Sequence, residues 1–487
     1  MDTTTRFPVA AVAATSLGFA LVQLDVTIVN VALPRIFADL AASISALQWI
    51  VDAYTLSFAA LLLTAGALGD RLGARATYIA GFGIFALASA MCGLAPDARS
   101  LIAARALQGL GAALLVPSSL ALLDAACGGD KVRRARGVAF WTASGGMSIA
   151  AGPLLGALLV DTLGWRWIFF LNVPVCVLAA LAVIRLKMPS PSHSNSARGY
   201  DPLGQILAVV ALAALVATII EASAATVDPA FIVGGSIVAL LATLGFCIVE
   251  SRAATPMLPL VFFTRPGFSR AMLFGVIVNF TYYGIVFALS LYLQQARGYS
   301  PLDAGLAYLP LTATFIVSNV MSGSVMARYG TRVPMIVGAV IGACGFTLLL
   351  RLEDASTFLS MLPPFALIPF GMGLAVPAMT TLMLSSLERR FAATASGALN
   401  AARQAGGALG VAVFGALVAH DPIIGGLHQA AFMSAALMVI AAVIAVARKQ
   451  AIDRLGREGL RTRAPSPSMK PAPWMRVTTE RRVHFSE

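Results

Sequence analysis

Long apolar segments follow one another along almost the whole chain and constrain its fold more than any other feature. Fourteen stretches of roughly 20 mainly apolar residues can be marked, and a helix of that length crosses a hydrocarbon core of about 30 Å. They cover residues 11–33, 47–69, 77–95, 101–123, 137–160, 166–185, 203–220, 230–249, 269–293, 304–326, 333–350, 358–384, 394–418 and 427–447. We therefore expect an all-α polytopic membrane protein with fourteen transmembrane helices.

The composition excludes an ordinary soluble globule. Of the 487 residues, 59% are apolar and only 11% are charged, whereas soluble domains carry about 25% charged residues. So few charged side chains cannot cover the surface of a soluble chain of this length, and lipid must cover it instead. The net charge of +12 does not indicate a nucleic-acid partner, because basic patches interleaved with aromatic residues are absent.

The positive charges between the segments predict the orientation in the membrane. With both termini in the cytoplasm, each of the six inner loops holds at least two Lys or Arg, and no outer loop holds more than one. Short positively charged loops are retained in the cytoplasm. The alternation therefore favours fourteen segments with both termini in the cytoplasm. The first segment contains Asp25 and is too long for a signal peptide, so we interpret it as an uncleaved helix.

An internal repeat relates the loop after the second segment to the loop after the tenth. At an offset of 257 residues, Gly66, Arg71, Gly73 and Arg75 fall on Gly323, Arg328, Gly330 and Arg332, while Asp70 falls on Ala327. Segments 1 to 6 and 9 to 14 then form two parallel six-helix repeats, the arrangement expected when two halves rock about a site at mid-membrane.

This repeat divides the chain into four parts. We expect a first six-helix bundle (1–187), a linker with an inserted pair of helices (188–266), a second six-helix bundle (267–447) and a basic cytoplasmic tail (448–487). For the tail, a disordered solvated segment is favoured over a short helix lying on anionic lipid.

The motif GALGDRLGAR joins the second and third segments. Gly66 and Gly73 permit close helix approach and a tight turn. Asp70 can accept hydrogen bonds from a helix N-terminus or pair with a guanidinium, and Arg71 and Arg75 supply positive charge beside it. A gating loop is one interpretation, and a positively charged loop that only fixes topology is the other.

Three charged residues lie inside apolar segments of the first half. Asp25, Asp52 and Arg105 fall within roughly 6 Å of one depth, because a helix rises 1.5 Å per residue. An intramembrane charge is costly and indicates function by default, so we predict a proton-coupling site that all three share. The alternatives are a neutralised pair that fixes helix packing, an Asp52 that reaches the interface and an Arg105 that extends outward.

Other polar and helix-bending residues suggest where a substrate lies. Gly152, Pro153 and Gly156 in the fifth segment predict a kink and close helix packing. Candidate cavity residues are Asn30, Trp49, Asn279, Tyr282, Tyr283, Asn319, Asn400, Arg403 and Gln404. Most of these could equally be contacts between helices.

The sequence lacks the motifs of several enzyme classes and of common metal sites. No P-loop, H-E-x-x-H or G-x-S-x-G sequence occurs, and the four histidines lie outside the apolar segments or at a segment boundary. The five cysteines are scattered singly, which indicates neither a disulfide framework nor a zinc site. We expect no enzyme activity, no metal site and no cofactor.

At this point the sequence resembles a known family. The motifs LDVTIVNVALP, QWIVDAYTL, GALGDRLGAR, RALQGLGAA, GPLLGA and WRWIFFLNVPV are similar to those of the fourteen-span drug:proton antiporters of the major facilitator superfamily. The resemblance implies the major facilitator fold and an alternating-access exporter driven by inward proton movement. It also implies roles for single residues: Asp25 as the span-1 acid, Arg105 as the span-4 arginine, Asp70 and Arg71 as the gating-loop pair, and Gly152 and Pro153 as the antiporter motif.

This chain departs from the family pattern in three places. Ala74 stands where a basic residue is usual, Ala157 replaces a glycine, and Asp52 is an additional acid. Family members that export divalent cations resemble carriers with a further acid in the tenth span. This chain lacks that acid, which argues for monovalent or neutral substrates.

We therefore expect a proton-coupled exporter of lipophilic or cationic small molecules, with multidrug efflux as its role. The alternatives are a dedicated metabolite or siderophore exporter of the same fold and a membrane sensor that does not transport. The expected partners are the substrate, protons and membrane lipid, and a periplasmic adaptor is left open.

Overall fold

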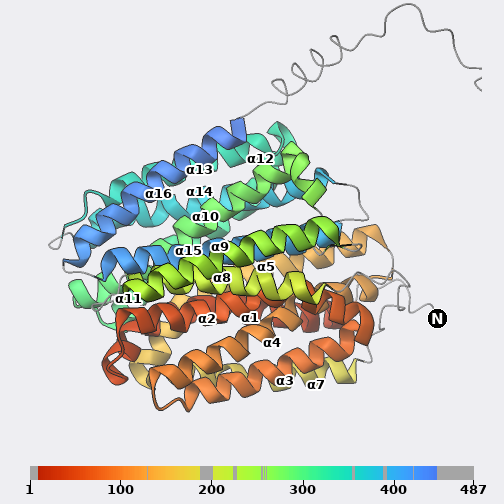
Figure 1. Cartoon of the computed structure of the whole chain (residues 1–487), viewed down its shortest axis with the longest axis horizontal. Helices are drawn as coiled ribbons and strands as arrows, with labels where there is room; N and C mark the ends of the chain where they lie inside the picture. Colours follow the sequence, from red (N-terminus) through yellow and green to blue (C-terminus); the bar gives the residue numbers. More distant parts are fainter. Residues whose placement is uncertain are drawn as a thin grey trace, which may run out of the picture. The chain divides into compact units, whose positions relative to one another are not determined.

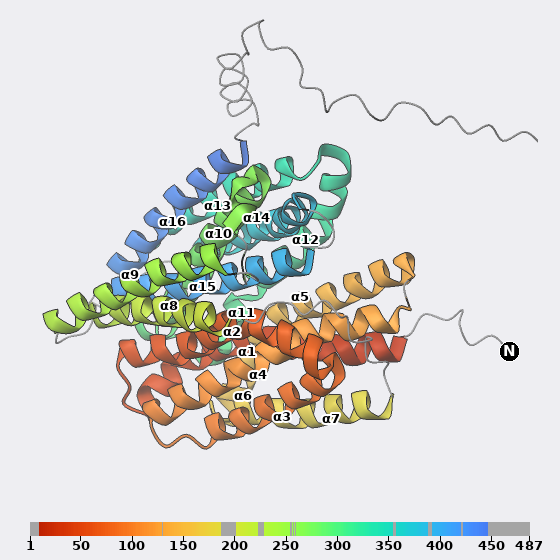
Figure 2. The same cartoon turned by 45° about the vertical axis from the view of Figure 1, so that its right-hand side comes forward.

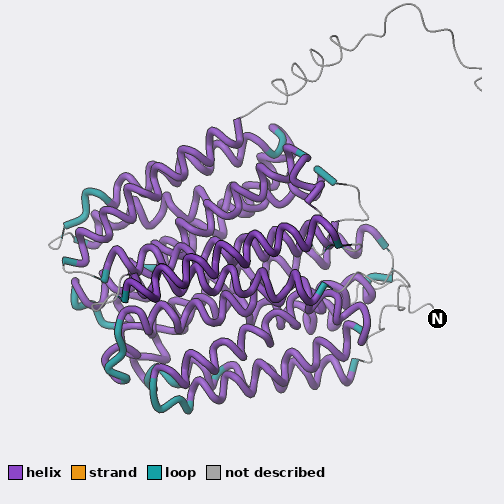
Figure 3. Tube along the Cα trace, viewed as in Figure 1, coloured by secondary structure: helices purple, strands orange, loops and turns teal. Residues whose placement is uncertain are grey.

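The computed structural model describes residues 9–128, 130–186, 201–222, 228–253, 256, 258, 260–353, 357–387, 392–419 and 422–446. Nearly all of these residues lie in helices (Figure 3). The helices are α1 (Val9–Asp39), α2 (Ile44–Leu72), α3 (Ala74–Gly93), α4 (Ala98–Ala126), α5 (Lys131–Thr162), α6 (Trp167–Phe170), α7 (Asn172–Arg185), α8 (Pro202–Ala222), α9 (Pro229–Arg252), η1 (Leu260–Thr264), α10 (Pro266–Leu291), η2 (Tyr292–Ala296), α11 (Pro301–Ala307), α12 (Leu309–Tyr329), α13 (Arg332–Leu349), α14 (Phe358–Ser385), α15 (Ala392–Val418) and α16 (Ile423–Val446). The polar part of the expected linker and the basic tail (448–487) lie outside the described residues.

The prediction of fourteen transmembrane helices is confirmed. Within the described ranges, 14 helical spans are long and apolar enough to cross a membrane. Three of these spans contain a break or a change of helix type: α6 with α7, α10 with the π-helical turn η2, and α11 with α12. Proline explains two of the breaks. Pro174 and Pro310 each lie near the start of a helix, where the ring cannot donate a backbone hydrogen bond to the preceding turn.

The two sets of six spans pack their helices in the same order. In the first half (α1–α7), α1 packs on α5, α2 on α4, α4 on α3 and α3 on α7. In the second half (α10–α16), the equivalent pairs are α10 with α15, α12 with α14, α14 with α13 and α13 with α16. Figures 1 and 2 show these halves as the red-to-yellow and the green-to-blue groups of helices.

The turn glycines that the sequence repeat aligns have similar backbone conformations. Gly73 lies between α2 and α3 with φ of 91°, and Gly330 follows α12 with φ of 76°. Positive φ favours glycine because a Cβ would clash with the backbone. The same turn chemistry therefore closes the second span of each half.

The halves meet along two seams. On one seam α2 packs on α15, and on the other α5 packs on α11 and α12. The inserted helices α8 and α9 pair with each other, and α8 also packs on both α2 and α15. Val216 and Ile220 of α8 share an apolar cluster with Leu56, Ala408 and Ala412. The inserted pair thus covers the seam between α2 and α15.

Hydrogen bonds tie the halves together near one end of the bundle, which we call the α1–α2 end because the loop 40–43 joins these helices there. Three side chains donate across the interface: Ser290 Oγ to Asn30 O at 2.5 Å, Gln294 Nε2 to Val31 O at 3.0 Å, and Gln48 Nε2 to Ala412 O at 2.7 Å. The described halves are therefore held together at the α1–α2 end.

Candidate functional site

A buried ion pair lies in the first half. The Arg105 guanidinium of α4 donates from Nη1 to Oδ2 of Asp25 in α1, at 2.5 Å. The exposed fraction of these side chains is 1% and 0%. The structure thus brings together two of the three charged residues that the sequence placed at one depth.

Neutral side chains satisfy the other carboxylate oxygen. Gln108 Nε2 and Asn172 Nδ2 each donate to Asp25 Oδ1 at 2.9 Å, and both also donate to Ser89 Oγ, at 2.7 and 3.1 Å. All three side chains are buried. Both carboxylate oxygens of Asp25 therefore have hydrogen-bond partners, as buried polar atoms require.

Helix α4 positions the arginine. Its first turn is capped by Asp97, whose side chain accepts from the Ser100 amide at 2.8 Å. This hydrogen bond holds the pKa of Asp97 below its usual value. Two turns later Arg105 donates from Nε to the Ile50 carbonyl at 3.0 Å, and its guanidinium lies 4.2 Å from the centre of the Tyr54 ring. Arg105 therefore connects α4 to α2 as well as to α1.

Asp52 lies apart from this pair. It is fully buried on α2, one turn after Gln48, which binds α15, and one turn before Leu56, which packs against Ala408 and Ala412 of α15. Its Oδ1 accepts a long hydrogen bond from Thr55 Oγ1 at 3.4 Å, and Oδ2 has no hydrogen-bond partner among the described residues. Asp52 thus belongs to the seam between the halves.

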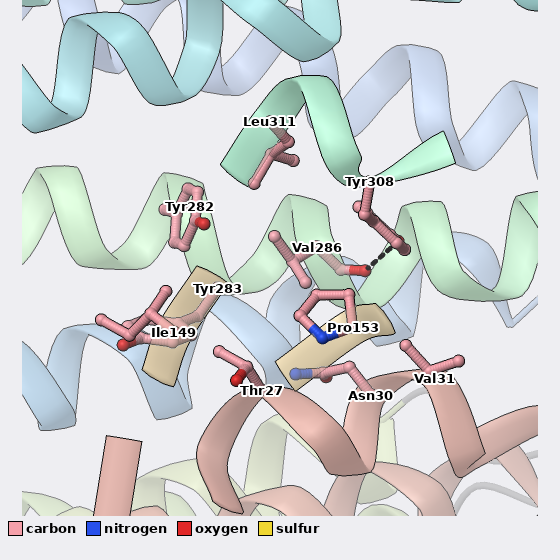
Figure 4. A pocket seen from close by; sticks show the side chains of 10 residues that line it. All are labelled: Thr27, Asn30, Val31, Ile149, Pro153, Tyr282, Tyr283, Val286, Tyr308 and Leu311. Carbon is pink, nitrogen blue, oxygen red and sulfur yellow. Dashed lines mark hydrogen bonds between the residues drawn. The ribbon is translucent and has the colours of Figure 1, made fainter. Parts of the chain in front are cut away.

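A small cavity lies between the two halves (Figure 4). Its lining comes from α1, α5, α10 and the α11–α12 region: Thr27, Asn30, Val31, Ile149, Pro153, Tyr282, Tyr283, Val286, Tyr308 and Leu311. Its volume is about 20 Å³, which is room for about one water molecule. A drug-sized ligand needs several hundred cubic ångströms, so the halves must separate before such a ligand can occupy this position.

The glycines of α5 allow α1 to approach closely. A Cβ on Gly152 would collide with the Thr27 side chain, and one on Gly156 would lie 2.8 Å from Ile28 Cγ1. Pro153, between them, lines the cavity. The structure therefore places this motif at the contact between α5, α1 and the second half.

The loop motif lies at the end of the bundle opposite the loop 40–43. Gly66 faces Pro117 of α4, and Arg75 donates from Nη2 to the Ile184 carbonyl at the end of α7, at 2.9 Å. Arg71 is exposed, and the Asp70 side chain lies outside the part of the chain that the structure describes. Arg75 thus holds α3 against α7.

The remaining cavity candidates fall into three groups. Asn30, Tyr282 and Tyr283 line the cavity. Asn279 is buried and donates to the Gly275 carbonyl of its own helix at 2.8 Å. The other candidates are partly exposed and do not line this cavity: Trp49, Asn319, Asn400, Arg403 and Gln404.

The neutral partners of the ion pair, Gln108 and Asn172, were not among the site residues predicted from the sequence. Gln108 was detectable, because it follows Arg105 by three residues and so shares its helix face. Asn172 lies within the motif WRWIFFLNVPV, whose Trp165 and Arg166 bind Asp39 at 2.8 and 2.6 Å. This motif therefore reaches α1 at two levels.

The family assignment follows from comparison with known proteins. A family model described as Major Facilitator Superfamily matches residues 15–411. The chain belongs to the Major Facilitator Superfamily. It is a transporter and not an enzyme, it is a multi-pass membrane protein, and transporters of this superfamily generally need no cofactor.

Relatives in three bacteria are similar over most of their length. The methylenomycin A resistance protein of Bacillus subtilis (strain 168) is 36% identical over 86% of this chain and 89% of the relative. The tetracenomycin C resistance and export protein of Streptomyces glaucescens is 37% identical over 83% of this chain and 75% of the relative. The multidrug resistance protein Stp of Mycobacterium tuberculosis (strain H37Rv) is 35% identical over the same shares. The resemblance inferred from the motifs is confirmed.

Proposed function

We propose that this chain exports lipophilic or cationic small molecules in exchange for protons. Transport occurs by alternating access across the bacterial inner membrane, with both termini in the cytoplasm. The observation that carries the proposal is the buried Asp25 carboxylate, which is held by Arg105, Gln108 and Asn172 one turn from cavity residues of α1. The names of the relatives, which describe antibiotic resistance and export, support the same role.

Asp25 and Asp52 are the proposed proton-binding residues. Protonation of Asp25 would remove the charge that faces Arg105 and so weaken the connection between α1 and α4. Asp52 lies where the halves pack together and has an oxygen without a hydrogen-bond partner among the described residues, so a proton would lower the cost of its burial. Separation of the halves would expose this carboxylate to water and favour release of the proton.

Substrate binds between the halves in this proposal. Asn30, Tyr282 and Tyr283 supply polar groups in an otherwise apolar lining, which is the composition typical of small-molecule sites. The cavity is too small for such a ligand in the present arrangement. The binding state is therefore one in which α1 and α5 have moved away from α10 and α12.

The test is transport by the purified protein in proteoliposomes with an imposed pH gradient and a panel of dyes and antibiotics. We expect wild-type protein to move several compounds, and Asp25→Asn to bind them but lose gradient-driven movement. Asp161→Asn is the matched control, because Asp161 is an exposed acid at the end of α5. Gradient-driven transport by Asp25→Asn at the wild-type rate would overturn the coupling role. Binding without transport by the wild type would instead support a sensor, and transport of a single compound a dedicated exporter.

A further inference from the structure

A second arginine lies deep in a span, in the half that lacks the ion pair. Arg403 is the twelfth of the 27 residues of α15 (Ala392–Val418), and so lies near the middle of the membrane. A cation at this depth costs several kcal/mol unless it faces a polar interior or a counter-charge. Its surroundings therefore require an explanation.

Arg403 has no protein partner in the described part of the chain. Its Nε is buried without a hydrogen-bond partner, and the structure records no ion pair for its guanidinium among the described residues. Arg105, the intramembrane arginine of the first half, has hydrogen bonds from Nε and Nη1 and an aromatic ring beside it. The two intramembrane arginines thus differ in kind.

The described part of the second half offers no carboxylate for this cation. Among the described residues of 266–446, the acids are Asp303 and Glu353, and both are exposed near helix ends. In the first half, Asp25 is bound by Arg105, and Asp52 Oδ2 is itself without a partner. The described residues therefore supply no counter-charge to Arg403.

Packing places Arg403 beside the cavity. Its Cγ lies 3.4 Å from where a Cβ on Gly275 would be, so its stem lies against α10. One turn further along α15, Gly407 lies against the ring of Tyr283, which lines the cavity. The Arg403 guanidinium is also within electrostatic range of the Tyr283 hydroxyl. The free cation is thus the neighbour of a cavity-lining residue.

We propose that Arg403 binds an anionic oxygen group of the exported molecule, with a carboxylate as the best fit. The proposal rests on the exporter role and deepens it, because it names a substrate class: lipophilic compounds that carry a carboxylate. A guanidinium is planar, stays charged and presents a fork of donors that matches a carboxylate. A substrate anion supplies the counter-charge that the described helices do not.

The experiment measures binding of matched ligand pairs to the full-length protein in lipid nanodiscs. The probes are rhodamine B, which has a free carboxylate, against its ethyl ester, and 2-naphthoate against 2-naphthamide. We expect wild-type protein to bind at least one carboxylate more tightly than the partner that lacks it. Arg403→Gln should weaken binding of that carboxylate about tenfold to a hundredfold, the loss typical of a charge-assisted hydrogen bond, and should not weaken binding of the cationic ester or the neutral amide.

Two further variants separate recognition from folding. Arg403→Lys keeps the charge but not the fork, so its carboxylate affinity should lie between those of the wild type and Arg403→Gln. Arg351→Gln removes an exposed arginine after α13 and should bind both ligands as the wild type does.

The proposal is overturned if wild-type protein prefers neither carboxylate, or if Arg403→Gln weakens both members of a pair equally. Transport of the ester in proteoliposomes keeps the exporter role separate. Gradient-driven ester transport without carboxylate preference would leave the exporter standing and remove the role of Arg403. A carboxylate preference that depends on Arg403, without transport, would support the role of Arg403 and remove the exporter role.

Discussion

Replacing Asp25 and replacing Arg105, the two members of the buried ion pair, should lower the free energy of unfolding by different amounts. Asp25→Asn removes the negative charge that faces the guanidinium, so Arg105 becomes a buried cation without a counter-charge. Breaking a buried pair in this way costs about 3–5 kcal/mol of unfolding free energy. The cost is high because a guanidinium cannot release its proton.

Arg105→Gln should cost less. The Asp25 carboxylate keeps its hydrogen bonds from Gln108 and Asn172, at 2.9 Å each, and it can take up a proton when its cation is removed. We expect a loss of about 1.5–3 kcal/mol, the value of a hydrogen bond to a charged group. The double variant carries neither charge, so its loss should fall below the sum of the single losses by about 2 kcal/mol, within the range of contacting pairs.

Unfolding of the four proteins in mixed detergent micelles, followed by tryptophan fluorescence, measures this cycle. The exposed pair of Asp39 and Arg166, at 2.6 Å with 49% and 39% of the side chains exposed, is the control. Its coupling should be only about 0.2–1 kcal/mol, because water screens both charges. If the losses at Asp25 and Arg105 add to within about 0.5 kcal/mol, the two residues are not a buried ion pair and the argument fails.

Three other changes test the packing and the gates. Gly152→Val should lower the free energy of unfolding by about 1–3 kcal/mol through overpacking against α1, and it should slow transport. Gly146→Val, at a position where a Cβ meets nothing within 4 Å, should do neither. Equal thermal unfolding of both variants would contradict this. Gln48→Leu removes a cross-half hydrogen bond worth about 1 kcal/mol, so cysteine labelling from the side of the loop 40–43 should rise, and unchanged labelling would count against it. Asp70→Asn should raise labelling of positions near the loop 71–75 and slow transport, whereas Ala327→Gly should do much less; without that difference the loop only fixes topology.

The number and order of the helices were predictable from sequence because a membrane span is defined by length and hydropathy alone. The break at Tyr308 was not predicted, since an apolar run shows no interruption there. Its cause is local: Pro310 cannot donate a hydrogen bond to the preceding turn. Helix ends also extend beyond the predicted spans, as in α1, which continues to Asp39, because hydropathy marks the hydrocarbon core and not the helix.

Only the depth of the site residues in the membrane was predictable from the sequence. Depth follows from the rise of 1.5 Å per residue, and it brought Asp25 and Arg105 together correctly. The direction in which a side chain leaves its helix depends on which neighbour packs there. Asp52 therefore shares the predicted depth but faces α15, where Gln48 and Leu56 on the same side of α2 make their contacts.

Among the described residues, four charges lie deep in the spans, and they can be ordered by what neutralises them. Arg105 is paired with Asp25, so this pair can respond to a proton but not to an anion. Asp52 and Arg403 lack ion-pair partners among the described residues and lie on α2 and α15, which pack against each other across a seam. A proton can neutralise an acid, whereas an arginine requires an anion. An exchanger must bind protons and substrate at different times, and these two residues meet that requirement with opposite charges on opposite halves. The double variant Asp52→Asn with Arg403→Gln should therefore remove both the proton-dependent and the carboxylate-dependent changes in binding. Asp52→Asn alone should remove only the proton-dependent change, and Arg403→Gln alone only the carboxylate-dependent change.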